Sequence, residues 1–277
     1  MTYEESFRAL TDLYAHPLVQ DFYHHLQTVA GFSLSPSLKS LFDNYHKHCF
    51  DEPRPEFNVD WGPESANWKW QRLHSGAIGS CRSALTAVLY HRENLLRLER
   101  DILSFLYRDQ LVPIVGRAAI AGGNSQKLNF EYHAFVFAYR RTLDYLTIAI
   151  AALLRQEFRS YRRLPTFLNR HMEHAWVRDV LKVHEKYAPQ LKTFLGSATE
   201  MSARDKIAHY LAIEAACVNV NAQGLFLAGG PEGLDASTQM GTLINDYVRT
   251  ICDLIAGTLA GMTTGLPKAY RRTKPCS

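Results

Sequence analysis

The sequence predicts an all-α protein, a helical bundle with one small β excursion. Apolar residues recur at three- and four-residue spacing over most of the 277 residues, as in helices with one buried face. One long segment, about Leu128 to Arg155, is apolar almost all round, which is typical of a helix at the centre of a bundle. Residues 216–228 depart from the helical pattern, with apolar residues around Asn221-Ala222-Gln223-Gly224 that indicate a short β-hairpin.

Composition sets limits on the classes of function. The chain is 47% hydrophobic and 21% charged, enough apolar sequence for a sizeable core. A net charge of +4 and a pI near 8.7 permit a polyanionic partner without requiring one. Five cysteines without a C-x-x-C pair favour neither a disulfide framework nor a zinc site, and they suit a reducing compartment. The polar, acidic N-terminus lacks the pattern of a signal peptide, so we expect a cytoplasmic protein.

The N-terminal half reads as short helices followed by one long helix. Helical spacing over residues 3–29, interrupted near Pro17, predicts two short helices. Ser35 and Pro36 have the pattern of an N-cap and a first-turn proline, which predicts a helix to about Phe50. Proline and glycine then predict a loop over residues 51–66, and helical spacing returns from Asn67 to about Arg108.

A domain boundary is expected within residues 111–125. This segment contains one proline and three glycines and has no helical apolar stripe. We therefore divide the sequence into an N-terminal helical region of unknown role, residues 1–118, and a helical bundle with a basic C-terminal tail, residues 119–277.

The second half continues as helices. The central helix at 128–155 is interrupted by Arg140, Arg141 and Asp144, so it is not expected to span a membrane. A basic segment over 155–174 is split by Pro165. Further helices are predicted at 175–194, with Gly196 as the stop, at 202–216 and at 242–262.

The greatest concentration of chemically useful residues lies at the start of the 202–216 helix. Ser202 and Asp205 have capping-box spacing, which favours a local structural role. Arg204 stands in the first turn, where the helix dipole disfavours a cation, so its position calls for another reason. Arg204 and His209 lie about 140° apart around an ideal helix and ~7.5 Å apart along it. Either the arginine bends toward the imidazole, or a second copy completes the site across a two-fold interface.

This stretch resembles a known motif. Arg204-Asp205-Lys206-Ile207-Ala208-His209 is similar to the R-x4-H motif of the HEPN superfamily of all-helical domains. The similarity extends to the long preceding helix, with its Tyr139-Arg140-Arg141-Thr142-Leu143-Asp144 core, and to the closing helix. It covers roughly residues 126–265 and implies a bundle of HEPN type. Residues 1–118 resemble no family that we can name.

The resemblance implies a metal-independent endoribonuclease without a cofactor. In this reading Arg204 binds and polarises the scissile phosphate, and His209 transfers a proton to or from the ribose and leaving-group oxygens. Asp205 orients one of these groups. Active members are usually homodimers and include toxins and defence effectors, so an antitoxin or another regulatory partner is also implied. Many members bind RNA or protein without cleaving, and a non-catalytic RNA- or protein-binding helical module is the alternative.

Two other groups of residues are candidate RNA contacts. His133, Arg140 and Asp144 form a polar stripe on the central helix, which lines the same cleft or is an ordinary surface stripe with an i,i+4 ion pair. The segment 155–174 combines arginines with aromatic residues, which suits either RNA contact or a solvated helix face. Its candidate contacts are Arg155, Arg159, Arg162 and Arg163. The closely spaced histidines have no zinc-motif partners, so no metal site is expected.

Overall fold

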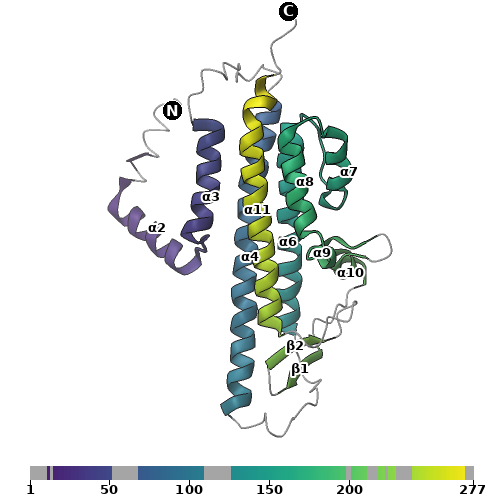
Figure 1. Cartoon of the computed structure of the whole chain (residues 1–277). Coiled ribbons are helices and arrows are strands. Elements are labelled where there is room, and N and C mark those ends of the chain that lie inside the picture. Colours follow the sequence, from purple (N-terminus) through teal and green to yellow (C-terminus); the bar gives the residue numbers. More distant parts are fainter. Residues whose placement is uncertain are drawn as a thin grey trace, which may run out of the picture. The chain divides into compact units, whose positions relative to one another are not determined.

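The computed structural model (Figure 1) describes residues 11–12, 15–51, 68–108, 126–197, 201–210, 217–221, 224–228 and 239–271. Within these ranges, the side chains of residues 50–51, 68, 105–107, 206, 208–210, 217–221, 224–228 and 265–271 lie outside the description. The chain forms two compact units, residues 1–35 and 36–277. Helices dominate both, which confirms the predicted all-α class.

The described part of the first unit is mainly helix α2 (Pro17–Ala30). The Nδ1 atom of His16 accepts a hydrogen bond from the Leu18 N–H, at 3.3 Å, and so caps the helix start. Pro17 occupies the first turn, where its missing N–H costs no hydrogen bond. The interruption predicted near Pro17 is therefore the beginning of a helix. The first of the two predicted short helices lies mostly outside the described residues.

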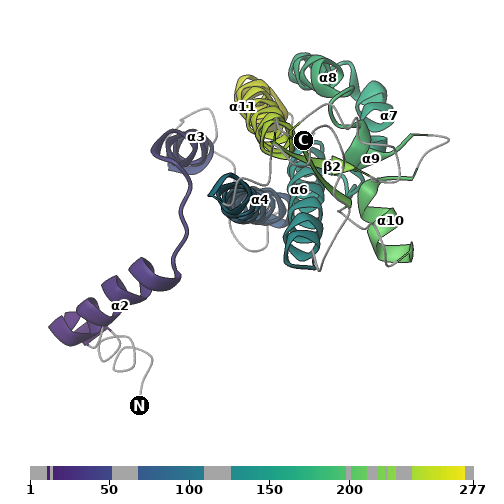
Figure 2. The same ribbon diagram turned by 90° about the horizontal axis from the view of Figure 1, so that it is seen from below.

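The second unit is built on three long helices, α4 (Trp68–Arg108), α6 (Gln126–Leu153) and α11 (Met240–Arg271), which lie side by side in Figures 1 and 2. Contacts along α4 and α6 run in opposite directions. His91 of α4 meets Glu131 near the start of α6 at 2.7 Å, and His74, nearer the start of α4, meets the Ala149 carbonyl near the end of α6 at 2.9 Å. The two helices are therefore antiparallel.

The core of the bundle lies on α6. Phe135, Leu143, Leu146 and Ile150 have no exposed surface, and buried positions occur on every side of the helix towards its C-terminal end. This pattern follows from contacts with α4 and with α11. The predicted central helix is confirmed, with its end two residues earlier than expected, at Leu153.

Shorter helices cover the three long ones. Helix α3 (Pro36–His46), continued by the π-helical turn Lys47–Asp51, packs on α4 and α11, and its Asp43 accepts a hydrogen bond from Arg82 at 2.8 Å. Helix α8 (Ala175–Tyr187) packs on α11. There Gly257 and Gly261 allow close approach, since a Cβ atom on Gly257 would lie 3.0 Å from the Val183 side chain.

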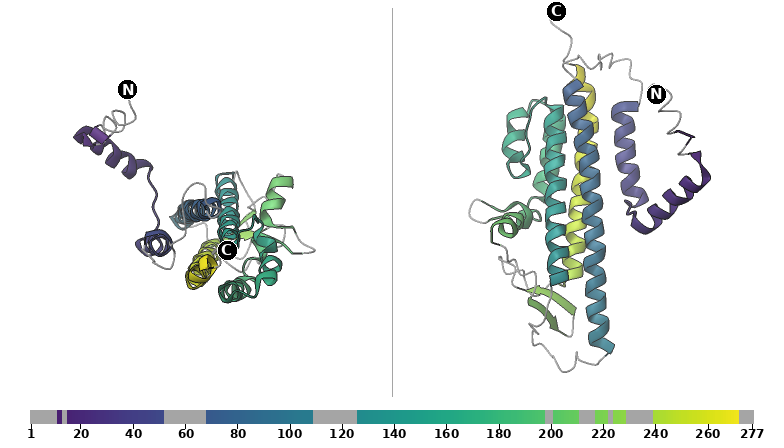
Figure 3. Two further views of the ribbon diagram at one scale, coloured as in Figure 1. Left: turned by 90° about the horizontal axis from the view of Figure 1, so that it is seen from above. Right: turned by 180° about the vertical axis from the view of Figure 1, so that it is seen from behind.

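A two-stranded hairpin lies at the end of the bundle where α4 ends and α6 begins (Figure 3). Strand β1 (Cys217–Asn221) pairs antiparallel with β2 (Gly224–Ala228), with Asn221 opposite Gly224. Strand β2 contacts α11 and α4. The hairpin occupies the place that the sequence predicted for it.

Three predicted elements need correction. The single helix expected at 175–194 is interrupted after Tyr187 by a turn that contains Pro189, and a separate short helix, α9 (Lys192–Leu195), follows. Gly196 does stop it, with φ of 68°. Pro165 lies in the first turn of α7 (Leu164–Leu168), so it begins a helix where we expected a break. The closing helix runs over Met240–Arg271, longer than the predicted 242–262.

The compact units do not divide where the sequence suggested. We expected a boundary between residues 118 and 119, within a segment that lies outside the described residues. The helices before and after it, α4 and α6, pack along each other and share one core. The division between units falls instead between Ser35 and Pro36. In the sequence, residues 111–125 therefore stand between two helices of one bundle.

Candidate functional site

The R-x4-H stretch forms the short helix α10 (Ala203–Tyr210), which packs against α6 and α9. The Oγ atom of Ser202 accepts a hydrogen bond from the Asp205 N–H at 3.1 Å, which confirms the predicted N-cap. Ser202 is 1% exposed, and Ala203 and Ile207 are also buried, one turn apart. These contacts fix one face of α10 on the bundle.

Arg204 lies away from that buried face. Its side chain is 49% exposed, and its Nη1 atom is 3.3 Å from Oδ1 of Asp205. The Asp205 carboxylate therefore neutralises part of the guanidinium charge and limits where it can move. The side chain of His209 lies outside the described residues, so its position relative to Arg204 stays a prediction.

Helix α9, on which α10 packs, is held by three aromatic rings. Phe194 stacks on Tyr139 of α6, with ring centroids 3.8 Å apart and planes 9° from parallel. It also meets Tyr247 of α11 edge to face, at 4.8 Å. The Tyr139 hydroxyl donates a hydrogen bond to the Tyr247 carbonyl at 3.2 Å, and burial raises the pKa of Tyr139. The ring contacts thus fix α9 against both long helices, and the hydrogen bond joins those two helices to each other.

Arg140 and Asp144, predicted as RNA contacts, act within the fold. Arg140 Nε donates to Asp144 at 3.2 Å, and its Nη1 donates to the Phe194 carbonyl at 3.4 Å. The other carboxylate oxygen of Asp144 accepts the Tyr161 N–H at 3.2 Å. The Arg140 side chain is only 11% exposed. The pair therefore joins α6 to the end of α9 and to the segment after α6, while His133 on the same stripe is half-buried.

The basic segment after α6 contains exposed arginines, one of which also donates a hydrogen bond to the backbone after α9. Arg162 donates a hydrogen bond to the Ser197 carbonyl, just after α9, although its side chain is largely exposed. Arg155, Arg159 and Arg163 are exposed. The segment is a chain of short turns, with a 3₁₀ turn at Tyr161–Arg163 before α7. Its arginines therefore lie on turns and short helices. The segment does not form the single solvated helix face that was the alternative prediction.

Arg155 has an unusual backbone conformation. Its φ is 56°, the left-handed region that favours glycine. The Arg155 N–H bonds to the Ala152 carbonyl and the Gln156 N–H to the Ala151 carbonyl, both at 3.0 Å. This is the hydrogen-bond pattern of a Schellman helix end, with arginine where glycine is usual. A non-glycine residue in this strained conformation makes Arg155 a candidate for a functional test.

Two buried tyrosine–histidine pairs stabilise the core. His74 Nδ1 lies 2.9 Å from the Ala149 carbonyl, which can only accept, so Nε2 is left to accept from the Tyr45 hydroxyl at 3.0 Å. His184 Nδ1 lies 3.1 Å from the Tyr161 hydroxyl. Burial lowers the pKa of each histidine to about 4. Both are neutral near pH 7 and belong to the interior.

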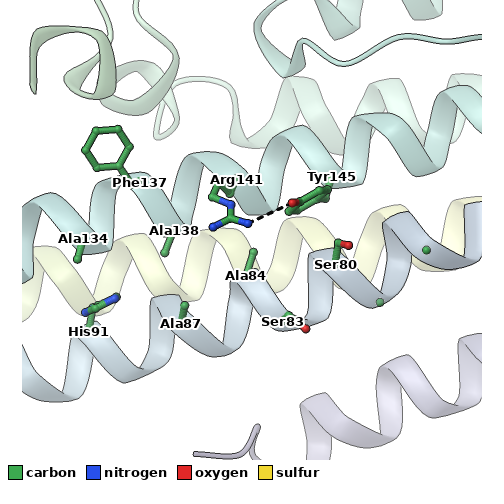
Figure 4. A pocket seen from close by; sticks show the side chains of 12 residues that line it. Ser80, Ser83, Ala84, Ala87, His91, Ala134, Phe137, Ala138, Arg141 and Tyr145 are labelled. Atoms are coloured by element: carbon green, nitrogen blue, oxygen red, sulfur yellow. Dashed lines mark hydrogen bonds between the residues drawn. The ribbon is translucent and has the colours of Figure 1, made fainter. Parts of the chain in front are cut away.

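A groove of about 570 Å³ runs between α4 and α6 (Figure 4). Small residues, among them Gly76, Gly79 and Ala134, line much of it. Arg141 donates a hydrogen bond to the Tyr145 hydroxyl at 3.2 Å within the groove. The lining of this groove contains one arginine and one histidine, so it carries little positive charge.

A second pocket, of about 370 Å³, is more basic. Lys69 and Arg72 of α4 line it with Glu157 and Arg159. Sequence reasoning singled out Arg159 but missed Lys69 and Arg72. The two residues stand at i, i+3 on a predicted helix, a common surface pattern, and their proximity to Arg159 arises from the antiparallel packing of α4 and α6.

No group of three or more histidine, cysteine, aspartate or glutamate side chains in the described ranges is arranged to hold a metal ion. Among the described helical residues, no stretch combines the length and apolarity needed to cross a membrane. Compared with protein-family models, curated proteins and solved structures, the chain matches none.

Proposed function

We propose that this protein is a metal-independent endoribonuclease of the HEPN type. The observation that carries the proposal is the start of α10, where a half-exposed Arg204 follows a buried serine cap on a helix whose other face packs on the bundle. A cation held at a fixed helix start, among N–H groups that lack helical partners, suits a phosphate. The resemblance to the R-x4-H motif adds His209 as the proton-transfer group.

The reaction would proceed by attack of the ribose 2′-oxygen on the adjacent phosphorus. The P–O5′ bond breaks as the P–O2′ bond forms, which leaves a 2′,3′-cyclic phosphate and a 5′-hydroxyl. Arg204 stabilises the charge that develops on the phosphate oxygens, and Asp205 restrains the guanidinium. One proton leaves the 2′-hydroxyl and one reaches the 5′-oxygen, and His209 performs one of these transfers. A second copy of the chain would supply the other group in a composite cleft.

The exposed arginines after α6 would hold the RNA strand. Arg155, Arg159 and Arg163 present charge from turns, and Arg162 adds a partly engaged guanidinium. Such contacts bind phosphates without reading sequence and make the affinity dependent on salt. Arg140 and Asp144 take a different role in the proposal, because they position the end of α9.

The alternative is an RNA-binding module that does not cleave. It is favoured by the ion pair between Arg204 and Asp205, since a carboxylate 3.3 Å from the guanidinium competes with a phosphate for the same donors. In that case α10 would be a capped structural helix, and RNA would bind through the basic segment alone.

The test is cleavage of a mixed tRNA and single-stranded RNA pool in EDTA, read on a denaturing gel. Wild type, His209→Ala, Arg204→Ala and Asp205→Asn are compared, with Arg249→Ala as the control because Arg249 is exposed and pairs with Asp246, three residues earlier on the same helix. We expect cleavage by wild type and by the control, and its loss in His209→Ala and Arg204→Ala with unchanged helical circular dichroism. If wild type and all variants bind RNA and none cleaves it, the endoribonuclease proposal is refuted and the RNA-binding module is favoured.

A further inference from the structure

The pocket between the start of α4 and the segment after α6 has an excess of positive charge. Lys69, Arg72 and Arg159 oppose a single acidic residue, Glu157, so the lining has three positive charges and one negative, a net of +2. Its volume of about 370 Å³ lies within the range of roughly 300–1,000 Å³ in which proteins hold small ligands.

The rest of the lining is apolar and partly flat. Leu73, Ile148 and Phe158 form this wall. The Phe158 ring stacks on Phe167, with centroids 4.5 Å apart and planes 6° from parallel, so its orientation is fixed before any ligand arrives. A preorganised aromatic ring beside aliphatic side chains offers a surface on which a planar base can pack.

Glu157 already acts as an internal anion at this pocket. Its carboxylate lies 2.5 Å from Lys69 Nζ, and this hydrogen bond lowers the pKa of Glu157. The side chains are 57% and 64% exposed, respectively. An ion pair so exposed contributes little to stability, so an incoming anion can displace the carboxylate at low cost.

We propose that this pocket binds a nucleotide unit. Its phosphate contacts Lys69, Arg72 and Arg159, and its base packs on the wall formed by Leu73, Ile148 and Phe158. The unit comes from a free nucleotide or from an RNA strand, which share this chemistry. The pocket includes Arg159, one of the proposed RNA contacts, but its ligand requires no cleavage, so this inference goes beyond the proposed function.

The experiment is a calorimetric titration at low salt with AMP, adenosine and a single-stranded oligoadenylate, using the full chain. We expect AMP to bind and adenosine, which lacks the phosphate, to bind at least tenfold more weakly. Arg72→Ala and Arg159→Ala should each weaken AMP binding about tenfold, because each removes a charge-assisted contact. Glu157→Gln should act in the opposite direction and tighten binding several-fold, while Arg249→Ala, the matched surface control, should leave it unchanged.

The oligonucleotide separates the two sources. Binding of AMP with the variant pattern above, and no such pattern for oligoadenylate, identifies a free-nucleotide site. The same pattern for oligoadenylate identifies an extension of the RNA path. The proposal is overturned if neither AMP nor oligoadenylate binds wild type, or if AMP and adenosine bind equally. It is also overturned if Glu157→Gln weakens binding as the arginine variants do. Each result is independent of whether His209→Ala abolishes cleavage.

Discussion

Arg155→Gly should stabilise the protein while weakening its contact with RNA. The left-handed conformation of Arg155, with φ of 56°, costs a residue with a Cβ atom roughly 1–2 kcal/mol. Glycine removes that cost but has a more disordered unfolded state, which takes back roughly 0.5–1 kcal/mol. The free energy of unfolding should therefore rise by about 0.5–1 kcal/mol, which corresponds to an increase of about 2 °C in Tm for a chain of this size.

Two sister variants separate backbone from charge. Arg155→Ala keeps the Cβ atom and loses the charge, so it should lack the gain in stability but share any loss of RNA affinity. Arg155→Lys keeps both the Cβ atom and the charge and should resemble wild type in both measurements. Urea denaturation gives the stability, and RNA binding at several salt concentrations gives the number of phosphate contacts.

For both Arg155→Gly and Arg155→Ala, we expect a weaker salt dependence of RNA binding. The magnitude of the slope of log association constant against log salt concentration should decrease by roughly 0.7, the value for one phosphate contact with a single strand. If Arg155→Gly is no more stable than Arg155→Ala, the left-handed strain is absent in solution. If the slope stays at its wild-type value in both, Arg155 does not contact RNA, and its retention at a glycine position has no functional explanation in the proposed RNA path.

Three further predictions concern stability. Ser202→Ala should lower the free energy of unfolding by about 1 kcal/mol through loss of the α10 cap, as measured by urea denaturation. Gly257→Leu should push α8 away from α11 and lower Tm in a thermal scan, because the leucine side chain would enter space held by Val183. Gly76→Ala, at a helix position open to solvent, should not lower Tm. His74 and His184 have pKa values of about 4 when folded and near 6.5 when unfolded, so the unfolded chain binds more protons between these values. The stability that these neutral histidines contribute is complete above about pH 6.5 and is lost as the pH falls towards 4. Between pH 7 and pH 5 the free energy of unfolding should fall by about 2 kcal/mol for each histidine. Urea denaturation across that range would measure the loss, and the stability of His184→Gln should depend less on pH.

Local sequence signals predicted the elements that local physics determines. The proline at position 36, the buried stripe of α6, the stop at Gly196 and the serine cap of α10 each depend on residues a few positions apart, and each matches the structure. The hairpin was predictable for the same reason, because its two strands are separated by only two residues. The break after Tyr187 was predictable in principle from Pro189, which the helical spacing around it outweighed.

Contacts between distant segments could not be obtained in this way. The periodicity of α4 and α6 shows that each has an apolar face, but it does not show that those faces meet. The prolines and glycines between them consequently looked like a domain boundary. Lys69 and Arg72 went unnoticed as site residues because only antiparallel packing brings them near Glu157 and Arg159, almost 90 positions later.

The arginines show why residue type alone does not distinguish an RNA contact from a support. Arg140 and Arg162 both donate to carbonyl groups at or just after the end of α9, at Phe194 and Ser197. These carbonyls lie immediately before the segment that leads to Ser202 and α10. A positive charge beside the last carbonyls of a helix is favourable, and here two such charges lie at the end of α9, against which α10 packs. Two residues that the sequence suggested as RNA contacts thus support α9, so we expect their replacement to affect any cleavage indirectly, through the packing of α10 on α9.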